Sequence, residues 1–436
     1  MYHQKLGNRK ASPSPGRGLF ASCLLALALF TAAPAAAQQV GAVFVIAMEN
    51  TNWKQVSNQF TGEHQQIFGN NPAAPYLNKL VNGTSPAGKQ VAYAVAYHNV
   101  MATPTGDGPD IHPSEPNYIW SEAGTNFNVK NDNQPFGDGG TEQSAGTLHL
   151  TGMLQKRGVT WKSYQEDVDL VTASGGVNTP GKDCVSNTVA PQSQWTVPLV
   201  NFSGNSANYT NAYNHSHQYG YAAKHNPMVF FPDTSGGNDA TAGNALAQHY
   251  APLQQLETDL KNNSVARYNW ITPDLYNDMH TGLHGGFTYN DHTYTDSPDS
   301  VGAEKIAQGD NFLSQIIPLI MASKAYKDNG VIIIWMDESE PDGTGSRNDF
   351  DHPIPEIVIS PLAHPNVNGV PYASTLNLTH SDDLRTWQDL FKVYNPSGNP
   401  YLGDAQNAVG LSDLFAPGAI TNSNAASSSK LGGAKP

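Results

Sequence analysis

The sequence predicts an α/β fold in which a central, mostly parallel sheet is sandwiched by helices and interrupted by long loop insertions. Two continuous apolar runs, Val43–Met48 and Val331–Met336, are rich in β-branched residues. Such runs are typical of strands buried on both faces, which occur mainly in parallel sheets covered by helices. A helical pattern over Phe312–Ala325 comes just before the second run. A helix leading into a buried strand is the alternation expected of an α/β protein.

Further elements lie between and after these two runs. The spacing of leucines predicts a helix over Asn244–Asn262, and Tyr268–Pro273 has the pattern of a strand. Pro353–Pro361 indicates another strand, framed by prolines that a strand tolerates only near its ends. The stretches 126–143 and 183–215 are polar and aperiodic. Stretches of this length belong to insertions around an active site or to a cap subdomain.

The N-terminus has the pattern of a secretory signal peptide over residues 1–37. Basic residues precede an apolar run from Leu19 to about Ala33, and small residues Ala35-Ala36-Ala37 precede Gln38. The apolar run is too short to favour a membrane span. Cys23 raises a lipoprotein alternative, but it lies near the start of that run, which disfavours it. We therefore expect an exported protein, periplasmic or secreted, with one domain over 38–417 and a disordered tail over 418–436.

Charge and cysteine content narrow the class of protein. The formal net charge is −14, from 37 acidic and 23 basic residues, which argues against a nucleic-acid binder. A small phosphorylated substrate remains compatible, because a bound cation and a few histidines reverse the local field inside an acidic protein. Cys184 is the one cysteine left after the leader, so an intramolecular disulfide is excluded. Export without a disulfide fits a large hydrophobic core.

Polar doublets follow both apolar runs and suggest a metal site. Glu49-Asn50 follows the first run, and Asp337-Glu338 follows the second. Ligands of open α/β sheets bind outside the carboxyl ends of the strands, which is where these four side chains lie. Donors that offer only oxygen favour a hard divalent cation. The alternative is that each doublet only ends a strand as a solvated turn, and the occurrence of two doublets weighs against it.

Ser114 is the candidate nucleophile. The segment His112-Pro113-Ser114-Glu115-Pro116-Asn117-Tyr118 has two prolines that restrict the backbone around the serine and predict an exposed turn. Most serines in such turns have no further role. Beside an oxygen-ligand metal site, however, a cation would lower the pKa of the hydroxyl and let it attack phosphorus. The Asn117 amide, three positions on, would point at the same anion.

Two histidines stand out among the 15 in the chain because of their positions. His280 follows the strand predicted at Tyr268–Pro273, and His292 follows at a distance that fits a loop over the same rim. His98, His112 and His352 are weaker candidates. Imidazolium groups around a transferred phosphoryl group stabilise its charge and protonate the leaving oxygen.

The order of these motifs resembles the phosphoesterase family that holds secreted acid phosphatases and bacterial phospholipases C, within the alkaline phosphatase superfamily. The resemblance covers about residues 41 to 395 and depends on segments in this order: Met48-Glu49-Asn50, His112 to Tyr118, Lys224-His225-Asn226-Pro227, Asn277-Asp278-Met279-His280, Gly309 to Leu313, Trp335 to Glu338, and Ser360-Pro361. It implies an alkaline phosphatase-like sheet sandwiched by helices, one divalent metal ion and a phosphoseryl intermediate.

The resemblance also implies roles for single residues. Carried over by position, the metal would be held by Glu49, Asn50, Asp337 and Glu338 together with Ser114. Asn117, His280 and His292 would grip the phosphate. His98 would be a further phosphate contact, but its compressed spacing to the serine leaves His98 and His112 as alternatives. Some relatives use Asp where this chain has Glu338, which changes geometry more than role.

The sequence therefore predicts an exported, metal-dependent phosphomonoesterase that acts through a phosphoserine on a small phosphorylated substrate. One alternative is a phospholipase C or other phosphodiesterase, which would bind a phospholipid head group and need an exposed apolar lip. Trp53, Trp120 and Phe127 lie near motif residues without forming an amphipathic membrane stretch. The other alternative is a non-catalytic extracytoplasmic binder of phosphorylated ligands, which has no need of an activated Ser114. We expect neither a nucleic-acid partner nor a transmembrane segment in the mature chain.

Overall fold

A computed structural model of the 436-residue chain describes residues 39–53, 67, 71–99, 111–172, 176–177, 186–295, 302–339 and 353–420. The predicted leader, Cys23, Cys184, His352 and most of the predicted tail lie outside the described residues. All described residues belong to one compact unit, 38–436. Among them, no helix combines the length and the hydropathy that crossing a membrane requires.

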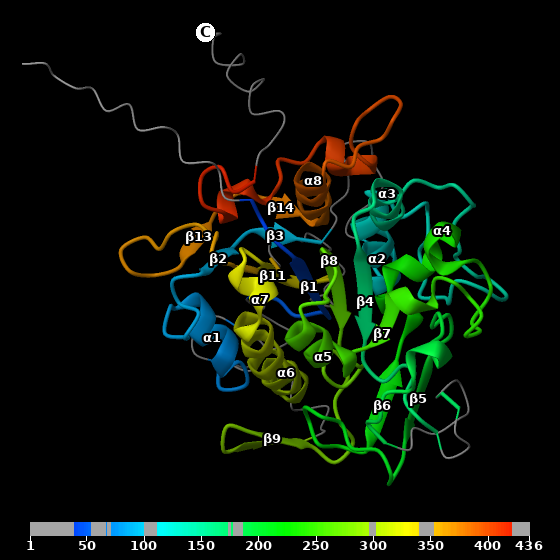
Figure 1. The fold of residues 1–436 in the computed structure, drawn as a ribbon. Coiled ribbons are helices and arrows are strands. Elements are labelled where there is room, and N and C mark those ends of the chain that lie inside the picture. The colour runs from blue at the N-terminus through cyan, green and yellow to red at the C-terminus, as the bar shows by residue number, and fades with distance from the viewer. Residues whose placement is uncertain are drawn as a thin grey trace, which may run out of the picture. The chain divides into compact units, whose positions relative to one another are not determined.

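The centre of this unit is an eight-stranded sheet in the order β13-β2-β12-β11-β1-β8-β4-β7 (Figure 1). Its strands in chain order are β1 (Val43–Met48), β2 (Val91–Ala94), β4 (Trp161–Gln165), β7 (Tyr250–Pro252), β8 (Tyr268–Thr272), β11 (Val331–Met336), β12 (Glu356–Ile359) and β13 (Tyr372–Ser374). Every pairing is parallel except those that β12 makes with β11 and β2. The predicted mostly parallel α/β sheet is confirmed.

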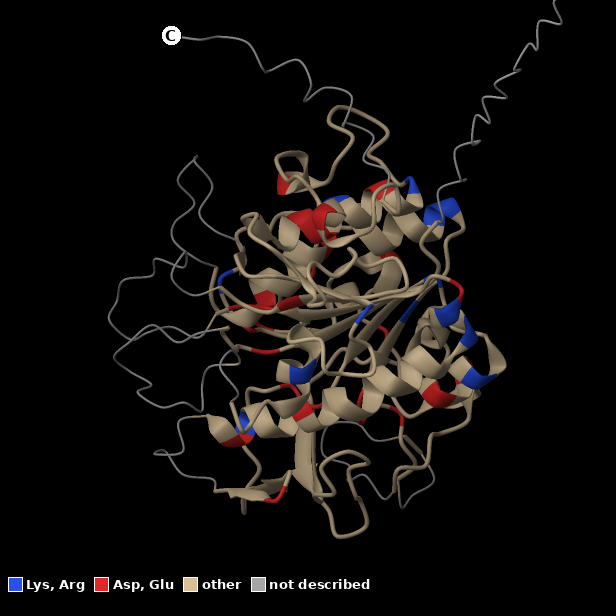
Figure 2. Ribbon diagram, turned by 90° about the vertical axis from the view of Figure 1, so that its left-hand side faces the viewer, with Lys and Arg blue, Asp and Glu red and all other residues tan. Residues whose placement is uncertain are grey.

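Helices cover both sides of the sheet, which lies between them in Figure 2. On one side α2 (Ser114–Ala123), α3 (Leu150–Arg157) and α8 (His380–Phe391) pack on one another, and on the other side α6 (Ala303–Ala322) packs on α1 (Pro75–Val81), α5 (Gln255–Asn262) and α7 (Lys324–Lys327). A short helix, α4 (Pro232–Ser235), packs on α3. The predicted sandwich of helices around the sheet is therefore confirmed.

Smaller elements lie around the central sheet. The two-stranded sheets pair β3 (Tyr97–His98) with β14 (Leu378–Thr379), β5 (Phe202–Asn205) with β6 (Gln218–Tyr221), and β9 (Phe287–Tyr289) with β10 (His292–Tyr294). The short 3-10 helices are η2 (Gln192–Gln194), η3 (Ala223–His225), η4 (Pro227–Phe230), η5 (Ala247–His249), η8 (Gly403–Gln406) and η9 (Leu411–Leu414).

Strands β1 and β11 form the core of the sheet. Every residue of both strands is buried, as expected for β-branched runs covered on two faces. They pair in parallel register from Val43 with Val331 to Met48 with Met336. Because the strands end at the same level, the doublets that follow them meet at one edge of the sheet.

Some predicted elements have different bounds. The helix predicted over Asn244–Asn262 is wrong in its first half, which forms η5 and the edge strand β7 before α5 begins at Gln255. Pro252 would interrupt a helix but is tolerated on an edge strand. The helix predicted at Phe312 begins earlier, at Ala303, and ends where the Ser323 hydroxyl caps α7. The strand predicted over Pro353–Pro361 shortens to β12 and runs antiparallel.

Candidate active site

Four adjacent parallel strands end at one edge of the sheet and deliver acidic side chains there. The strands are β11, β1, β8 and β4, in this spatial order. The buried acidic residues that follow them are Asp337 and Glu338 after β11, Glu49 after β1, Asp274 and Asp278 after β8, and Glu166 and Asp167 after β4. This edge therefore concentrates carboxylates, and they fall into two clusters.

The first cluster joins the two predicted doublets. The Asn50 side-chain amide donates to Glu338 Oε1 at 3.0 Å, which ties the end of β1 to the end of β11. The Asp337 backbone N–H donates to the Met48 carbonyl at 3.2 Å, and the Glu49 N–H donates to the Asp278 carbonyl at 2.7 Å. The structure thus brings Glu49, Asn50, Asp337 and Glu338 together.

Ser114 lies at this cluster, but the local structure predicted for it is wrong. The serine is the first residue of α2 and is buried, where an exposed turn was expected. The prolines on either side fit a helix start equally well, because the first turn of a helix has no intrahelical use for its N–H groups. The Ser114 hydroxyl donates to Glu49 Oε2 at 3.1 Å and lies 3.5 Å from Glu338 Oε1.

The first turn of α2 also positions Asn117. Its amide donates to Glu338 Oε2 at 3.2 Å and to the Ile111 carbonyl at 2.8 Å. The N-terminal end of a helix attracts negative charge, because its first N–H groups are unpaired and the helix dipole is positive there. The predicted loop over 126–143 reaches the same turn, because Asp132 accepts from the Glu115 N–H at 3.1 Å. Asp132 thus occupies one N–H group of this helix end, and the positive end of the helix dipole would still favour a phosphate near Ser114.

The predicted histidines are placed differently from one another. His280 Nδ1 lies 3.3 Å from Glu49 Oε2, and its side chain is 37% exposed. His112 Nδ1 lies 2.8 Å from Glu338 Oε2. His98 is buried on β3, paired in register with Thr379, and burial lowers its pKa to about 4. His292 is exposed on β10, its ring is tilted against that of Tyr294 with centroids 4.6 Å apart, and among the described residues it makes no ion pair or hydrogen bond with the other candidates.

Three groups at the site were given no role from the sequence. Buried His225 places Nε2 3.0 Å from Glu49 Oε1, and its ring stacks on Tyr118 with centroids 5.1 Å apart. The Tyr118 hydroxyl donates to Glu49 Oε1 at 2.6 Å. Lys224 forms an ion pair of 3.0 Å with Asp132. Lys224 and His225 belong to the segment Lys224-His225-Asn226-Pro227, which is part of the family resemblance. That resemblance could have pointed to both residues.

Charge around Glu49 is partly balanced. Burial alone would raise the pKa of Glu49. The charges of His225 and Lys224 and a hydrogen bond from His280 outweigh burial and hold this pKa below its usual value. Burial lowers the pKa of His225 itself to about 4, so above that pH the effect depends on Lys224 and His280. Burial also lowers the pKa of Lys224, but Glu49 and Asp132 outweigh it and keep the amine protonated.

At the other carboxylates of this cluster, burial and neighbouring acidic groups outweigh the nearby positive charges. Burial and the charges of Glu49 and Glu338 raise the pKa of Asp337 well above its usual value, although the Ser114 hydroxyl partly offsets them. Burial also raises the pKa of Glu338. Burial and the Glu49 charge raise the pKa of Asp278 to about 8. Packed acidic groups of this kind call for a cation or for protons.

Buried acceptor atoms that receive no hydrogen bond from the described residues indicate that the cluster fits a cation. Within the described part of the chain, no hydrogen bond of normal geometry reaches Asp337 Oδ1, Asp337 Oδ2, Asn50 Oδ1 or Asn117 Oδ1, and all four atoms are buried. A buried acceptor without a donor costs free energy, so native structures rarely keep several together without a ligand. The side-chain atoms that would bind a cation are all oxygens, which suits a hard divalent cation.

The second cluster is also a buried acidic group compatible with a metal site, but its oxygens are satisfied. Glu166, Asp167 and Asp274 each place one carboxylate oxygen within 4.8 Å of the others. Their oxygens accept hydrogen bonds from the side chains of Asn211, Asn277 and Tyr209 and from the backbone N–H groups of Asp274, Gly220 and Tyr276. The first cluster therefore fits a cation better than the second.

Comparison with solved structures finds weak likeness over most of the chain. A protein in the alkaline phosphatase superfamily from Vibrio parahaemolyticus aligns with a TM-score of 0.40 and 12% identity, over 82% of this chain and 67% of that one. The lipoteichoic acid synthase LtaP from Listeria monocytogenes aligns with a TM-score of 0.43 and 11% identity, over 85% of this chain and 77% of that one. Likeness at this level says nothing about activity.

Sequence comparison finds fungal relatives and a family. The protein named "Probable acid phosphatase" in Kluyveromyces lactis is 24% identical over 169 residues, which is 39% of this chain and 30% of the relative. The "Acid phosphatase" of Aspergillus fumigatus is 24% identical over 39% of this chain and 28% of the relative. The match thus spans less than a third of these relatives. The model of the phosphoesterase family matches residues 28–394, so the chain belongs to the phosphoesterase family.

Proposed function

We propose that the chain is a phosphomonoesterase of the acid phosphatase type, with Ser114 as its nucleophile. One observation carries this proposal. The Ser114 hydroxyl, at the start of α2, lies 3.1 Å from Glu49 and 3.5 Å from Glu338, beside buried oxygens that lack a donor. The fungal relatives are named acid phosphatases, which supports a phosphomonoester as the substrate.

We assign the first cluster as the site of one divalent metal ion. Glu49, Asn50, Asp337 and Glu338 would hold it together with Ser114. Asn50 Oδ1 and both Asp337 oxygens are buried without a donor among the described residues, and the Glu49 and Glu338 carboxylates, which the Ser114 hydroxyl contacts, would complete the set of ligands. When bound, such an ion would lower the pKa of the serine hydroxyl and offset negative charge on the phosphoryl group.

The residues of the site supply a route for the protons. Ser114 Oγ would attack phosphorus and form an O–P bond while the bond from phosphorus to the leaving oxygen breaks. The hydroxyl proton already points at Glu49 Oε2, and His280 Nδ1 lies 3.3 Å from that same oxygen. His280, which is partly exposed, would protonate the leaving oxygen and recover a proton through Glu49. Water would then attack the phosphoserine, releasing phosphate and restoring the hydroxyl.

Several groups would bind the phosphate itself. The N-terminus of α2 carries the serine, and protonated Lys224 supplies positive charge near Glu49 and Asp337. Asn117 would donate to the phosphate once its amide nitrogen is released from Glu338. Buried His225 would fill the phosphate-binding role for which the sequence also suggested His292 and His98. Preorganised donors of this kind stabilise the charge that develops in the transition state.

The structure gives less support to a phospholipase. Trp53 and Trp120 are buried, with their indole N–H groups bound to the Ala94 carbonyl and to Ser381. Of the three aromatic residues that lie near the motifs, Phe127 is the one with an exposed side chain. A single exposed ring is a weak anchor for a membrane lipid.

A hydrolysis panel tests the proposal. The protein is assayed with p-nitrophenyl phosphate, its bis-ester and phosphatidylcholine, each with and without a chelator. We expect turnover of the monoester that the chelator abolishes. Faster hydrolysis of the bis-ester or the lipid would make the protein a phosphodiesterase, and phosphate binding without turnover of any ester would make it a binder.

Export is the remaining part of the proposal. It is supported by the basic start, the apolar run and the alanines before Gln38, which together have the pattern of a cleavable leader. The mature enzyme would then act outside the cytoplasm.

A further inference from the structure

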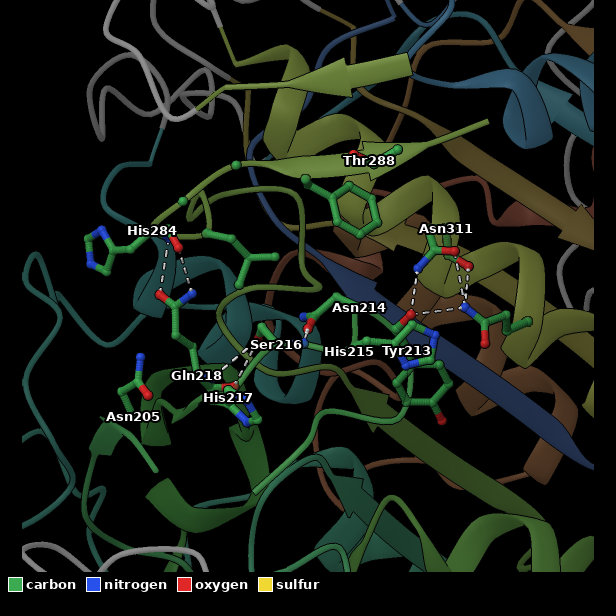
Figure 3. Close-up of a pocket in the computed structure, with 15 residues that line it drawn as sticks. Asn205, Tyr213, Asn214, His215, Ser216, His217, Gln218, His284, Thr288 and Asn311 are labelled. Carbon is green, nitrogen blue, oxygen red and sulfur yellow. Dashed lines mark hydrogen bonds between the residues drawn. The ribbon is translucent and has the colours of Figure 1, made fainter. Parts of the chain in front are cut away.

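A pocket of about 750 Å³ lies apart from the residues of the candidate active site. It is formed by the end of β5, the segment between β5 and β6, the segment that leads into β9, and one face of α6 (Figure 3). The lining residues that matter for binding are Asn205, Tyr213, His217, Gln218, Asn311 and Gln315. The volume falls in the range of small-molecule sites.

The chemistry of the lining is neutral and polar. It contains no lysine, arginine, aspartate or glutamate, although the chain as a whole carries a net charge of −14. A cation would find no carboxylate here, and an anion would find no permanent positive charge. Side-chain amides are frequent, and each amide offers both a donor and an acceptor, as a ligand rich in hydroxyl groups requires. The half-buried Tyr213 adds aromatic surface, whereas Phe287 is largely buried in the hydrophobic core.

Several of these amides are held in fixed orientations. The Asn311 amide donates to the Tyr213 carbonyl at 2.9 Å, and its oxygen accepts from Gln315 at 3.1 Å (Figure 3). Across the pocket, Gln218 accepts from the His284 N–H at 3.1 Å and donates to the His284 carbonyl at 3.4 Å. Polar groups that are already ordered lose little entropy when a ligand binds.

Other polar side chains on the lining have a donor or acceptor atom that makes no hydrogen bond to another described residue. The exposed Asn205 side chain makes no hydrogen bond to another described residue. His217 uses Nδ1 for the Tyr209 carbonyl at 2.5 Å, which leaves Nε2 for a ligand. The Gln315 amide nitrogen donates a hydrogen bond to Asn311, and the Gln315 side-chain oxygen can accept one from a ligand. The pocket thus combines fixed amides with vacant donors and acceptors.

We propose that this pocket binds a neutral polyhydroxylated ligand, that is, an uncharged sugar or cyclitol. Hydroxyl groups would pair with the amides, and a C–H face of the ring would pack on Tyr213. The pocket lies near the candidate active site along the chain: Leu283 follows His280 by three residues, which limits their Cα separation to about 11 Å. The ligand is therefore either a free saccharide or the sugar part of a phosphate ester.

Binding is tested by titrating the full protein with maltose and with myo-inositol in a calorimeter. The variants are Asn205→Leu and Gln315→Leu, and the matched control is Gln248→Leu, an exposed glutamine on η5 outside the pocket. We expect saturable binding of at least one ligand, a Kd raised about threefold to tenfold by each pocket variant, and no change in the control. The proposal is overturned if neither ligand binds, or if binding is unchanged in both pocket variants. Circular dichroism checks that each variant is folded.

A kinetic arm distinguishes the two sources of the ligand. If the pocket holds the sugar of a phosphate ester, Gln315→Leu raises KM for glucose 6-phosphate and leaves KM for p-nitrophenyl phosphate unchanged. If it holds a free saccharide, both KM values stay unchanged while the calorimetric affinity still falls. Failure of the wild type to hydrolyse any phosphate ester would reject the proposed activity, whereas the calorimetric test of the pocket would stand.

Discussion

The Asn50 side chain links two strand ends that lie 288 residues apart in sequence by donating to Glu338 Oε1 at 3.0 Å. This hydrogen bond uses the amide nitrogen and leaves Asn50 Oδ1 buried without a donor. The orientation matters, because a metal ligand must present oxygen and not nitrogen to a hard cation. Glu338 thus has two roles in the proposed metal site. It would be a ligand, and by accepting from the Asn50 nitrogen it orients the Asn50 oxygen toward the ion.

Replacement of the proposed nucleophile gives the most direct test of mechanism. Ser114→Ala should lose about 3 kcal/mol or more of transition-state stabilisation, roughly a hundredfold in rate. Ser121→Ala is a matched control on the same helix, because the Ser121 hydroxyl donates only to the Tyr118 carbonyl at 2.7 Å. Acid quenching of the wild type during turnover should trap phosphate on the peptide that contains Ser114. Near-normal activity of Ser114→Ala without a phosphopeptide would mean that water attacks directly.

Metal content distinguishes the two acidic clusters. Asp337→Ala should abolish turnover and weaken metal binding at least about tenfold, since loss of a direct ligand costs more than loss of an outer partner. Glu166→Gln should keep the metal, because the oxygens of its cluster are already hydrogen-bonded within the protein. The measurement is metal stoichiometry after dialysis. Normal metal content in a folded Asp337→Ala protein, or loss of metal in Glu166→Gln, would place the ion elsewhere.

A pair of histidine variants tests which imidazole binds phosphate. His225→Ala should lower kcat/KM at least about tenfold, because a buried group next to the reacting centre is removed. His292→Ala should stay within about twofold of the wild type, as expected for an exposed side chain on β10. Both variants are assayed with p-nitrophenyl phosphate at the same pH. The reverse order of effects would restore His292 as the phosphate contact and leave His225 as a packing residue.

The N-terminus of exported protein tests the leader. Mass spectrometry of material recovered outside the cytoplasm should find a chain that begins at Gln38 or Gln39, after the run of alanines. An intact Met1 on active exported protein would reject cleavage at this position.

The sequence predicted the strands that contain a clear apolar run, namely β1, β8, β11 and β12. Strands β1 and β11 were recognised because parallel strands with both faces covered must be apolar at every position. Strand β4 was missed because Lys162, Ser163 and Gln165 interrupt its apolar character. Lys162 is accommodated by an ion pair of 2.8 Å with Asp259, a tertiary contact that no local pattern reveals.

In the candidate site, too, the sequence pattern finds residues that follow apolar strands and misses residues that only tertiary contacts bring there. Side chains that directly follow apolar strands, such as Glu49 and Asp337, were found by position alone. His225 was assigned no role because it lies on the 3-10 helix η3, and its placement depends on stacking against Tyr118 of α2. The cluster of Glu166, Asp167 and Asp274 was missed together with β4, the strand that two of its members directly follow.

The cluster of Glu166, Asp167 and Asp274 should make the free energy of unfolding depend on pH. Burial and the Asp167 charge raise the pKa of Glu166 from 4.5 to about 8, and burial raises the pKa of Asp167 to about 6. The groups that face the two carboxylates are Asp274, Tyr209 and the amides of Asn211 and Asn277, none of which is cationic. The folded protein therefore holds protons here that the unfolded chain releases at lower pH.

The sign of the effect on stability follows from proton linkage. Between the unfolded pKa of 4.5 and the folded pKa of about 8, the folded state binds more protons, so this contribution of Glu166 to the free energy of unfolding is lost as pH rises. Glu166→Gln removes the titration and should make the pH dependence shallower, measured by urea denaturation at about pH 5 and about pH 8. Exposed Glu257→Gln is the control and should keep the wild-type slope. An equal change in stability at both pH values in Glu166→Gln would show that Glu166 is ionised throughout, and a counter-charge such as a bound cation would then have to occupy this cluster.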